Sequence, residues 1–132
     1  VTDRNVTVGV DLETWMTAEV ADAVARLVFS SGEQAVLERR RGSRLEALTC
    51  AFSAKESLFK ALHPLVGRCF DFADVEVREV SEADGSLCLT LNRELAPGLP
   101  VGRRFRIEVE RRRDHVLTWL AVARRTPFRR AR

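Results

Sequence analysis

The stretch that decides the fold is RLEALTCAFSAKESLFKAL, residues 44–62, which predicts a long helix. Ser43 stands at a capping position before this helix, and Pro64 is expected to close it. At about 100° per residue, the larger apolar side chains gather on one face of the helix. The buried stripe expected from this spacing consists of Leu45, Leu48, Phe52 and Phe59.

Glu56 falls on the same face as this apolar stripe, with Lys55 on one flank and Lys60 on the other. A carboxylate in such a place is costly unless it is paired, protonated or bound to a metal. An ion pair between Glu56 and Lys60 at i,i+4 spacing contributes only a few tenths of a kcal/mol on an exposed helix. A shared divalent cation is the second way to compensate the charge.

Two further carboxylates, Asp11 and Glu13, end a predicted strand that begins at Val6. Because successive side chains of a strand point to opposite faces, Asp11 and Glu13 are expected on one side and Leu12 on the other, in the packing. Three carboxylates with Glu56 would suit Mg²⁺, which prefers oxygen ligands and retains positions for waters and phosphates. The pattern indicates phosphoryl-group chemistry.

The composition indicates one domain in a chain of 132 residues, of which 45% are hydrophobic and 31% charged. The sequence contains no apolar run of about 20 residues that could span a membrane and no secretory signal. Cys50, Cys69 and Cys88 are far apart, which favours buried, reduced thiols in a cytoplasmic protein.

Cations are distributed unevenly along the chain. Only Lys55 and Lys60 are lysines, against 20 arginines, which suggests that this spot needs a compact ammonium rather than a guanidinium. Residues 101–132 carry a net charge of +8, so they are a candidate surface for nucleic acid, a phosphorylated cofactor or an acidic protein. We expect a domain over residues 1–123 and a basic tail over 124–132.

The remaining pattern predicts an α+β fold, with three helices packed on one face of a mainly antiparallel sheet. Trp15 is expected to pack against the domain, and Trp119 to lie in its core. Two shorter helices are expected over Ala18–Phe29 and Glu33–Arg41. After Gly67 the expected strands are Ala73–Val80, Ser86–Asn92, Arg104–Glu110 and Val116–Ala123.

Two segments carry a family resemblance: Gly9-Val10-Asp11-Leu12-Glu13, and Phe52-Ser53-Ala54-Lys55-Glu56-Ser57-Leu58-Phe59-Lys60-Ala61. They resemble the motifs G-[VI]-D-x-E and [FW]-[SC]-x-K-E-[SA]-x-x-K of the 4'-phosphopantetheinyl transferase superfamily. The likeness is greatest to the enterobactin-synthetase-type branch, which has an F-S-x-x-E segment similar to residues 29–33. Phe70-Asp71-Phe72 and His115-Val116-Leu117-Thr118 extend the likeness over most of the chain.

The resemblance implies a cytoplasmic enzyme that transfers phosphopantetheine from coenzyme A to a serine of an acyl or peptidyl carrier protein, releasing 3',5'-ADP. It implies Mg²⁺ held by Asp11, Glu13 and Glu56, with Glu56 or a metal-bound water as the base. Lys55 would contact a coenzyme A phosphate, and Lys60 would stabilise or protonate the leaving group. Nonribosomal peptide, polyketide or siderophore biosynthesis would be the setting.

Members of that branch consist of two similar halves, and this chain resembles the second half of such a pseudo-two-fold transferase. We therefore expect a fragment that needs a first half-domain, in the same or a separate chain, and self-association is the alternative. Apolar surface should be exposed in the chain alone. Two rival interpretations are a Mg²⁺-dependent nuclease and a basic nucleic-acid-binding module that uses residues 103–132. The helical setting of Glu56 and Lys60 argues against the first, and the absence of Tyr against the second.

Overall fold

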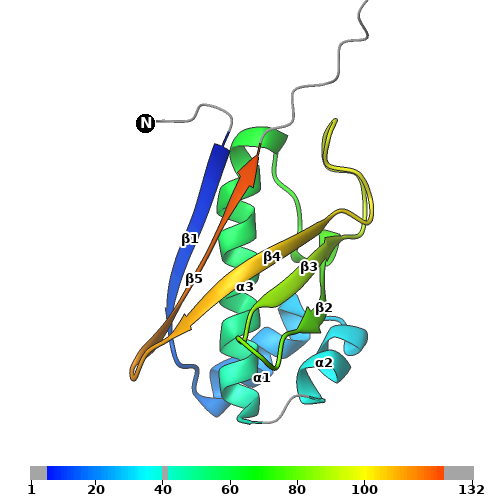
Figure 1. The fold of residues 1–132 in the computed structure, drawn as a ribbon. Coiled ribbons are helices and arrows are strands. Elements are labelled where there is room, and N and C mark those ends of the chain that lie inside the picture. Colours follow the sequence, from blue (N-terminus) through cyan, green and yellow to red (C-terminus); the bar gives the residue numbers. More distant parts are fainter. Residues whose placement is uncertain (1–5, 40–41, 124–132) are drawn as a thin grey trace, which may run out of the picture.

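The computed structural model describes residues 6–39 and 42–123, which form a sheet covered on one face by helices (Figure 1). The predicted α+β class, with three helices on an antiparallel sheet, is confirmed for these residues. In chain order the elements are β1 Val6–Thr14, α1 Ala18–Val28, α2 Ser31–Glu38, α3 Arg44–Val66, the short 3-10 helix η1 Phe72–Asp74, β2 Val75–Val80, β3 Leu87–Leu91, β4 Arg104–Arg111 and β5 His115–Ala123. The predicted tail, 124–132, lies outside the described residues.

The strands are ordered β1-β5-β4-β3-β2, and every neighbouring pair is antiparallel. β1 therefore lies at one edge, paired with β5 from Val6↔Ala123 to Thr14↔His115. In Figure 1, β5 and β4 cross in front of α3, and β1 runs alongside it on the left; all three strands contact the helix. This arrangement places the acidic end of β1 against the middle of the longest helix.

The buried stripe predicted for α3 is correct only in part, because Leu58 and Leu62 are fully buried beside Leu48, and small residues fill the contact with β1. Leu48 is buried, but Leu45, Phe52 and Phe59 are only half-buried. The phenylalanines instead meet other aromatic rings, with Phe59 at 4.8 Å from Phe70 and 4.9 Å from Phe72 between ring centroids. The small residues of α3 that are fully buried are Cys50, Ala51, Ser53, Ala54, Ser57 and Ala61.

Gly9 of β1 explains why small residues are needed there. A Cβ atom at this position would lie 1.8 Å from the backbone oxygen of Ser57 and 2.9 Å from the backbone nitrogen of Ala61. Strand and helix backbones therefore approach one another more closely than any side chain on β1 would allow. Gly9 comes two residues before Asp11, so the same approach brings Asp11 onto α3.

Four helix boundaries differ from the sequence prediction, including the end of α2 at Glu38 rather than Arg41. Helix α2 begins at Ser31 rather than Glu33 because Ser30 and Glu33 form a capping box, and α1 ends before Phe29. Pro64 does not close α3, which continues to Val66 and ends at Gly67. The left-handed conformation of Gly67 (φ 69°) supplies that end, and its N–H donates to the carbonyl of His63 at 3.0 Å.

The outward face of β1 is apolar and exposed, the reverse of the predicted arrangement. Leu12 is 58% exposed rather than packed, and Val8 and Val10 are 59% and 47% exposed. Trp119, opposite Val10 on β5, is 36% exposed and not in the core as predicted. The inward face of the strand instead carries Thr7, Gly9, Asp11 and Glu13. Glycine is needed there because the backbones of β1 and α3 are in contact.

Other local predictions have mixed outcomes. Trp15 packs against the core, and its indole N–H donates to the carbonyl of Arg112 at 3.1 Å. Cys50 is buried, whereas Cys69 is exposed and Cys88 half-buried, so the expectation of buried thiols holds for one of the three. Within residues 6–39 and 42–123, no helix combines the length and apolar character needed to cross a bilayer.

We predict that Gly9→Ala destabilises the fold by about 3 kcal/mol or more, because the clash is with backbone that cannot rotate away. Gly32→Ala is the matched control, since a Cβ there meets its nearest atom at 3.8 Å and the residue lies in α2. Urea denaturation of both variants measures the effect. Equal stability of the two variants would contradict the close approach of β1 and α3.

Candidate active site

Asp11 is the centre of the polar cluster that joins β1 to α3. Its side chain is buried, and both carboxylate oxygens accept hydrogen bonds from α3. The ammonium of Lys60 donates to Oδ1 at 2.9 Å, and the hydroxyl of Ser53 donates to Oδ2 at 2.8 Å. The side chain is thus fixed from two positions about two helical turns apart.

Glu13 and Glu56 lie close enough to Asp11 to alter one another's ionisation. Burial, a hydrogen bond to Asp11 and the charges of Asp11 and Glu56 raise the pKa of Glu13 from 4.5 to about 7, against the opposing effect of Lys60. Burial and the charge of Asp11 likewise raise the pKa of Glu56. The structure therefore brings the three predicted carboxylates into one electrostatic cluster, with Glu56 half-buried rather than free in bulk solvent.

The carboxylates of Asp11, Glu13 and Glu56 are chemically suited to Mg²⁺, although in the described residues they are not close enough together to coordinate an ion. Three carboxylates supply hard oxygen ligands, and their mutual repulsion is what a bound divalent cation would relieve. Across residues 6–39 and 42–123, no three acidic, histidine or cysteine side chains are gathered closely enough to hold an ion. One oxygen of Asp11 is bound by Lys60 instead.

Lys60 lies at the open side of the cluster. Its ammonium donates to the backbone carbonyl of Val10 at 3.0 Å as well as to Asp11, and its side chain is 52% exposed. The predicted alternative pairing with Glu56 is not among the ion pairs of the described residues. Lys60 can therefore meet an anion from solvent while it remains attached to β1.

Lys55 lies on a different side of α3 and is fully buried. Its ammonium forms an ion pair with Glu33 at 2.8 Å and donates to the carbonyls of Val28 at 3.1 Å and Phe72 at 3.2 Å. Three protein acceptors match the three N–H groups of an ammonium. The predicted contact of Lys55 with coenzyme A stays a prediction, and these contacts do not favour it.

Sequence reasoning missed three polar residues that organise the site. Glu33 receives Lys55, caps α2 through the N–H of Ser30, and accepts the N–H of Val77 at 2.9 Å. Ser53 and Thr118 form a buried hydroxyl pair behind Asp11. All three lie in segments that resemble the family, and Glu33 also completes a Ser-x-x-Glu capping pattern. The pairing of the two hydroxyls has no signal in the sequence, because it joins positions 65 residues apart.

The arginines of β4 and the following turn are largely paired with acids, which weakens the nucleic-acid interpretation for the described part of the surface. Arg106 pairs with Asp84 and with Glu108 at 2.9 Å. Arg112 pairs with Glu110. Such pairs neutralise the positive field that binding to a polyanion requires.

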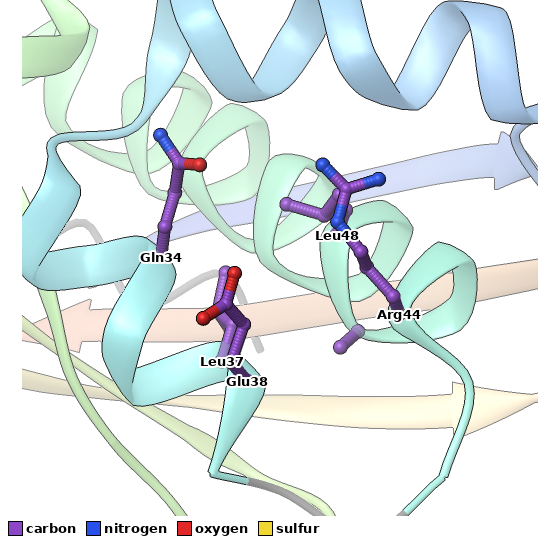
Figure 2. Close-up of a pocket in the computed structure, with 6 residues that line it drawn as sticks. Gln34, Leu37, Glu38, Arg44 and Leu48 are labelled. Atoms are coloured by element: carbon purple, nitrogen blue, oxygen red, sulfur yellow. The ribbon is translucent and has the colours of Figure 1, made fainter.

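A separate shallow pocket lies between α2 and the start of α3, away from the carboxylate cluster (Figure 2). It contains none of the predicted site residues, so we assign it no part in the chemistry. The residues that line it are Gln34, Leu37, Glu38, Arg44, Ala47 and Leu48.

Comparison with known families decides the assignment. Residues 7–118 match the family model of ACPS, the 4'-phosphopantetheinyl transferase superfamily. The chain belongs to this superfamily. The matched region runs from β1 through the middle of β5 and so includes every residue of the cluster. The prediction of an enzyme of the 4'-phosphopantetheinyl transferase class is thereby confirmed.

Solved ACPS structures share the fold. The apo-ACPS structure from Chronobacterium ammoniagenes is 27% identical, with a TM-score of 0.63 over 88% of this chain and 94% of that chain. The ACPS–CoA complex from the same organism is 24% identical, with a TM-score of 0.68 over 92% of this chain and 98% of that chain. The holo-[acyl-carrier-protein] synthase of Thermotoga maritima is 21% identical, with a TM-score of 0.65 over 90% of this chain and 64% of that chain. No curated protein sequence matches the chain.

The raised pKa of Glu13 predicts a pH dependence of stability. Between pH 4.5 and about 7 the folded transferase holds a proton on Glu13 that the unfolded chain has lost. Folding therefore takes up a proton in this window, and the free energy of unfolding falls as pH rises through it. Glu13→Gln, which mimics the protonated group, should flatten this slope in urea titrations with chelator present. The slope should persist in Glu38→Gln, an exposed control, and a slope unchanged in Glu13→Gln would contradict the coupling.

The buried ion pair of Lys55 and Glu33 predicts a large stability effect. Glu33→Gln leaves the ammonium buried without a counter-charge, so we expect a loss of about 3–5 kcal/mol in the free energy of unfolding. Asp22→Asn removes the exposed pair with Arg44 and should cost less than about 1 kcal/mol. Denaturant titration compares the two, and similar losses would show that the Lys55 pair is not effectively buried.

Proposed function

We propose that this transferase moves the 4'-phosphopantetheine group from coenzyme A to a serine of an apo acyl or peptidyl carrier protein, releasing 3',5'-ADP. The observation that carries the proposal is the cluster of Asp11, Glu13, Glu56 and Lys60 at the contact of β1 and α3. Membership of the superfamily supports the reaction class.

We propose that Asp11, Glu13 and Glu56 hold the Mg²⁺ ion of the reaction. When bound, Mg²⁺ would neutralise charge on the pyrophosphate of coenzyme A and polarise the phosphorus that is attacked. The raised pKa values of Glu13 and Glu56 support this assignment, because burial and the neighbouring carboxylate charges both disfavour the ionised forms that a bound cation would stabilise.

Glu56 is the proposed base. The serine oxygen of the carrier attacks the phosphorus that bears pantetheine, and the bond from this phosphorus to the bridging oxygen breaks. Glu56 accepts the serine proton directly or through a water, and its raised pKa makes it a stronger base than an ordinary carboxylate. The bridging electron pair leaves with the phosphate of 3',5'-ADP.

Lys60 is the residue that we propose to stabilise the leaving phosphate. Its exposed ammonium, fixed by Val10 and Asp11, can neutralise the developing charge or donate a proton to it. Lys55 would have to leave Glu33 to reach coenzyme A, so we assign the phosphate contact to Lys60 first.

We further propose that the chain acts as the second half of an enterobactin-synthetase-type transferase, with a first half-domain covering its outer sheet face. The support is the exposed apolar surface of Val8, Val10, Leu12 and Trp119, since soluble proteins seldom leave such a patch uncovered. The chain also matches 94% and 98% of the length of two ACPS chains, so it resembles these chains as a whole. A second copy of the chain is therefore the alternative partner for this apolar surface. The segment similar to F-S-x-x-E supports the branch assignment.

The test is a transfer assay with coenzyme A, magnesium chloride and an apo carrier protein, run with the chain alone and with a candidate first half-domain. We expect the carrier to gain the mass of one phosphopantetheine group. Glu56→Gln and Lys60→Met should each slow transfer by about 100-fold or more, the range typical of proton-transfer groups.

Glu38→Gln is the control, because Glu38 is exposed on α2 and lies outside the cluster. Activity of the chain alone together with a self-associated mass would favour the second copy over the half-domain. A carrier whose mass stays unchanged in both assays, or a Glu56→Gln variant as fast as the wild type, would contradict the proposed chemistry.

A further inference from the structure

Three hydroxyl side chains form a buried network behind Asp11. Ser53 and Ser57 come from α3 and Thr118 from β5, and all three are fully buried. Thr118 stands directly opposite Asp11 in the register of β1 and β5. The network therefore fills the corner where strand, strand and helix meet.

The Ser53 hydroxyl connects the network to Asp11. Ser53 has a single hydroxyl proton, which it donates to Oδ2 of Asp11 at 2.8 Å, so its oxygen accepts from its neighbours. Thr118 Oγ1 lies 2.8 Å from Ser53 Oγ and 3.0 Å from the Ser53 carbonyl, and can donate to either. Ser57 in turn donates to Thr118, either to its Oγ1 or to its carbonyl at 3.1 Å. Only the Ser53 hydroxyl donates to the carboxylate itself, and the hydroxyls of Thr118 and Ser57 surround Ser53 from behind.

This network controls the orientation of Asp11 rather than only filling space. Lys60 holds Oδ1 and is half-exposed, so it can release Asp11 when it turns to an incoming anion. Ser53 then still holds Oδ2, and Thr118 holds Ser53 in place through contacts to its hydroxyl at 2.8 Å and to its carbonyl at 3.0 Å. Outer groups of this kind orient the residues that perform the chemistry.

We propose that Ser53 and Thr118 are positioning residues of the transfer reaction, which keep the Asp11 carboxylate turned toward Glu13 and Glu56. This inference rests on the proposed function, so its test needs one measurement that is independent of transfer. The ¹³Cγ chemical shift of Asp11 at fixed pH, without metal or substrate, reports the hydrogen bond from Ser53.

The variants are Ser53→Ala, Thr118→Val and the conservative Thr118→Ser, with Thr49→Val as the matched control. Thr49 is also fully buried on α3, and its hydroxyl bonds the Leu45 carbonyl and the Met16 N–H, so its replacement carries a similar structural cost. Ser53→Cys, which retains a weaker donor, replaces Ser53→Ala should that variant fail to fold.

We expect the Asp11 signal to move in Ser53→Ala and Thr118→Val and to stay in place in Thr118→Ser and Thr49→Val. The same two variants should lower kcat by about 10- to 100-fold with the KM for the carrier unchanged, and Thr118→Ser should restore the rate. An unmoved Asp11 signal overturns the inference. So does a kcat in Ser53→Ala and Thr118→Val equal to that of Thr49→Val.

The outcomes separate this inference from the proposed function. If the Asp11 signal moves as expected but the wild type transfers nothing to any carrier, the proposed reaction fails, and with it the role of Ser53 and Thr118 in transfer. If the wild type transfers phosphopantetheine and the Asp11 signal is unaffected, the reaction stands and the positioning role fails.

Discussion

The close contact between the backbones of β1 and α3 is the constraint on which the rest of the structure depends. It exists because Gly9 has no side chain and because α3 turns serines and alanines to the sheet. The same contact brings Asp11 within hydrogen-bond distance of Ser53 and Lys60. Packing and chemistry therefore share one cause, and a larger residue at the contact would disturb both.

The two lysines of the chain carry the same ammonium group but have different roles, because they lie on different sides of α3. Lys55 and Lys60 are five residues apart on α3, so they leave the helix on different sides. Lys55 joins α3 to Glu33 and so fixes α2 and the start of β2 around the helix. Lys60 stays half-exposed beside Asp11, where a compact ammonium can meet a phosphate.

The two faces of β1 differ in polarity, because the inward face provides the carboxylates of the site. The inward positions of β1 are occupied by glycine and acids, so the valines and Leu12 of the alternating pattern must face outward. Trp119 continues this apolar surface onto β5. The fold thus completes its core with α3 and the inner sheet face, and leaves an apolar outer face that suits a partner.

The sequence by itself determined the α+β class, the order of the elements and the family, because strand alternation, capping residues and two motifs are local patterns. It also predicted one cluster of Asp11, Glu13, Glu56, Lys55 and Lys60, of which the structure brings together all but Lys55. It was wrong about Leu12 and Trp119, and only partly right about the buried stripe of α3. Leu48 is buried as its apolar character predicts, whereas the small residues at the contact with β1 are selected by the close approach of the two backbones. Only the tertiary structure decided that Lys55 is buried with Glu33 and that Ser53 and Thr118 support Asp11. These contacts join positions 22 to 65 residues apart, and a local sequence pattern does not specify which distant side chains will meet.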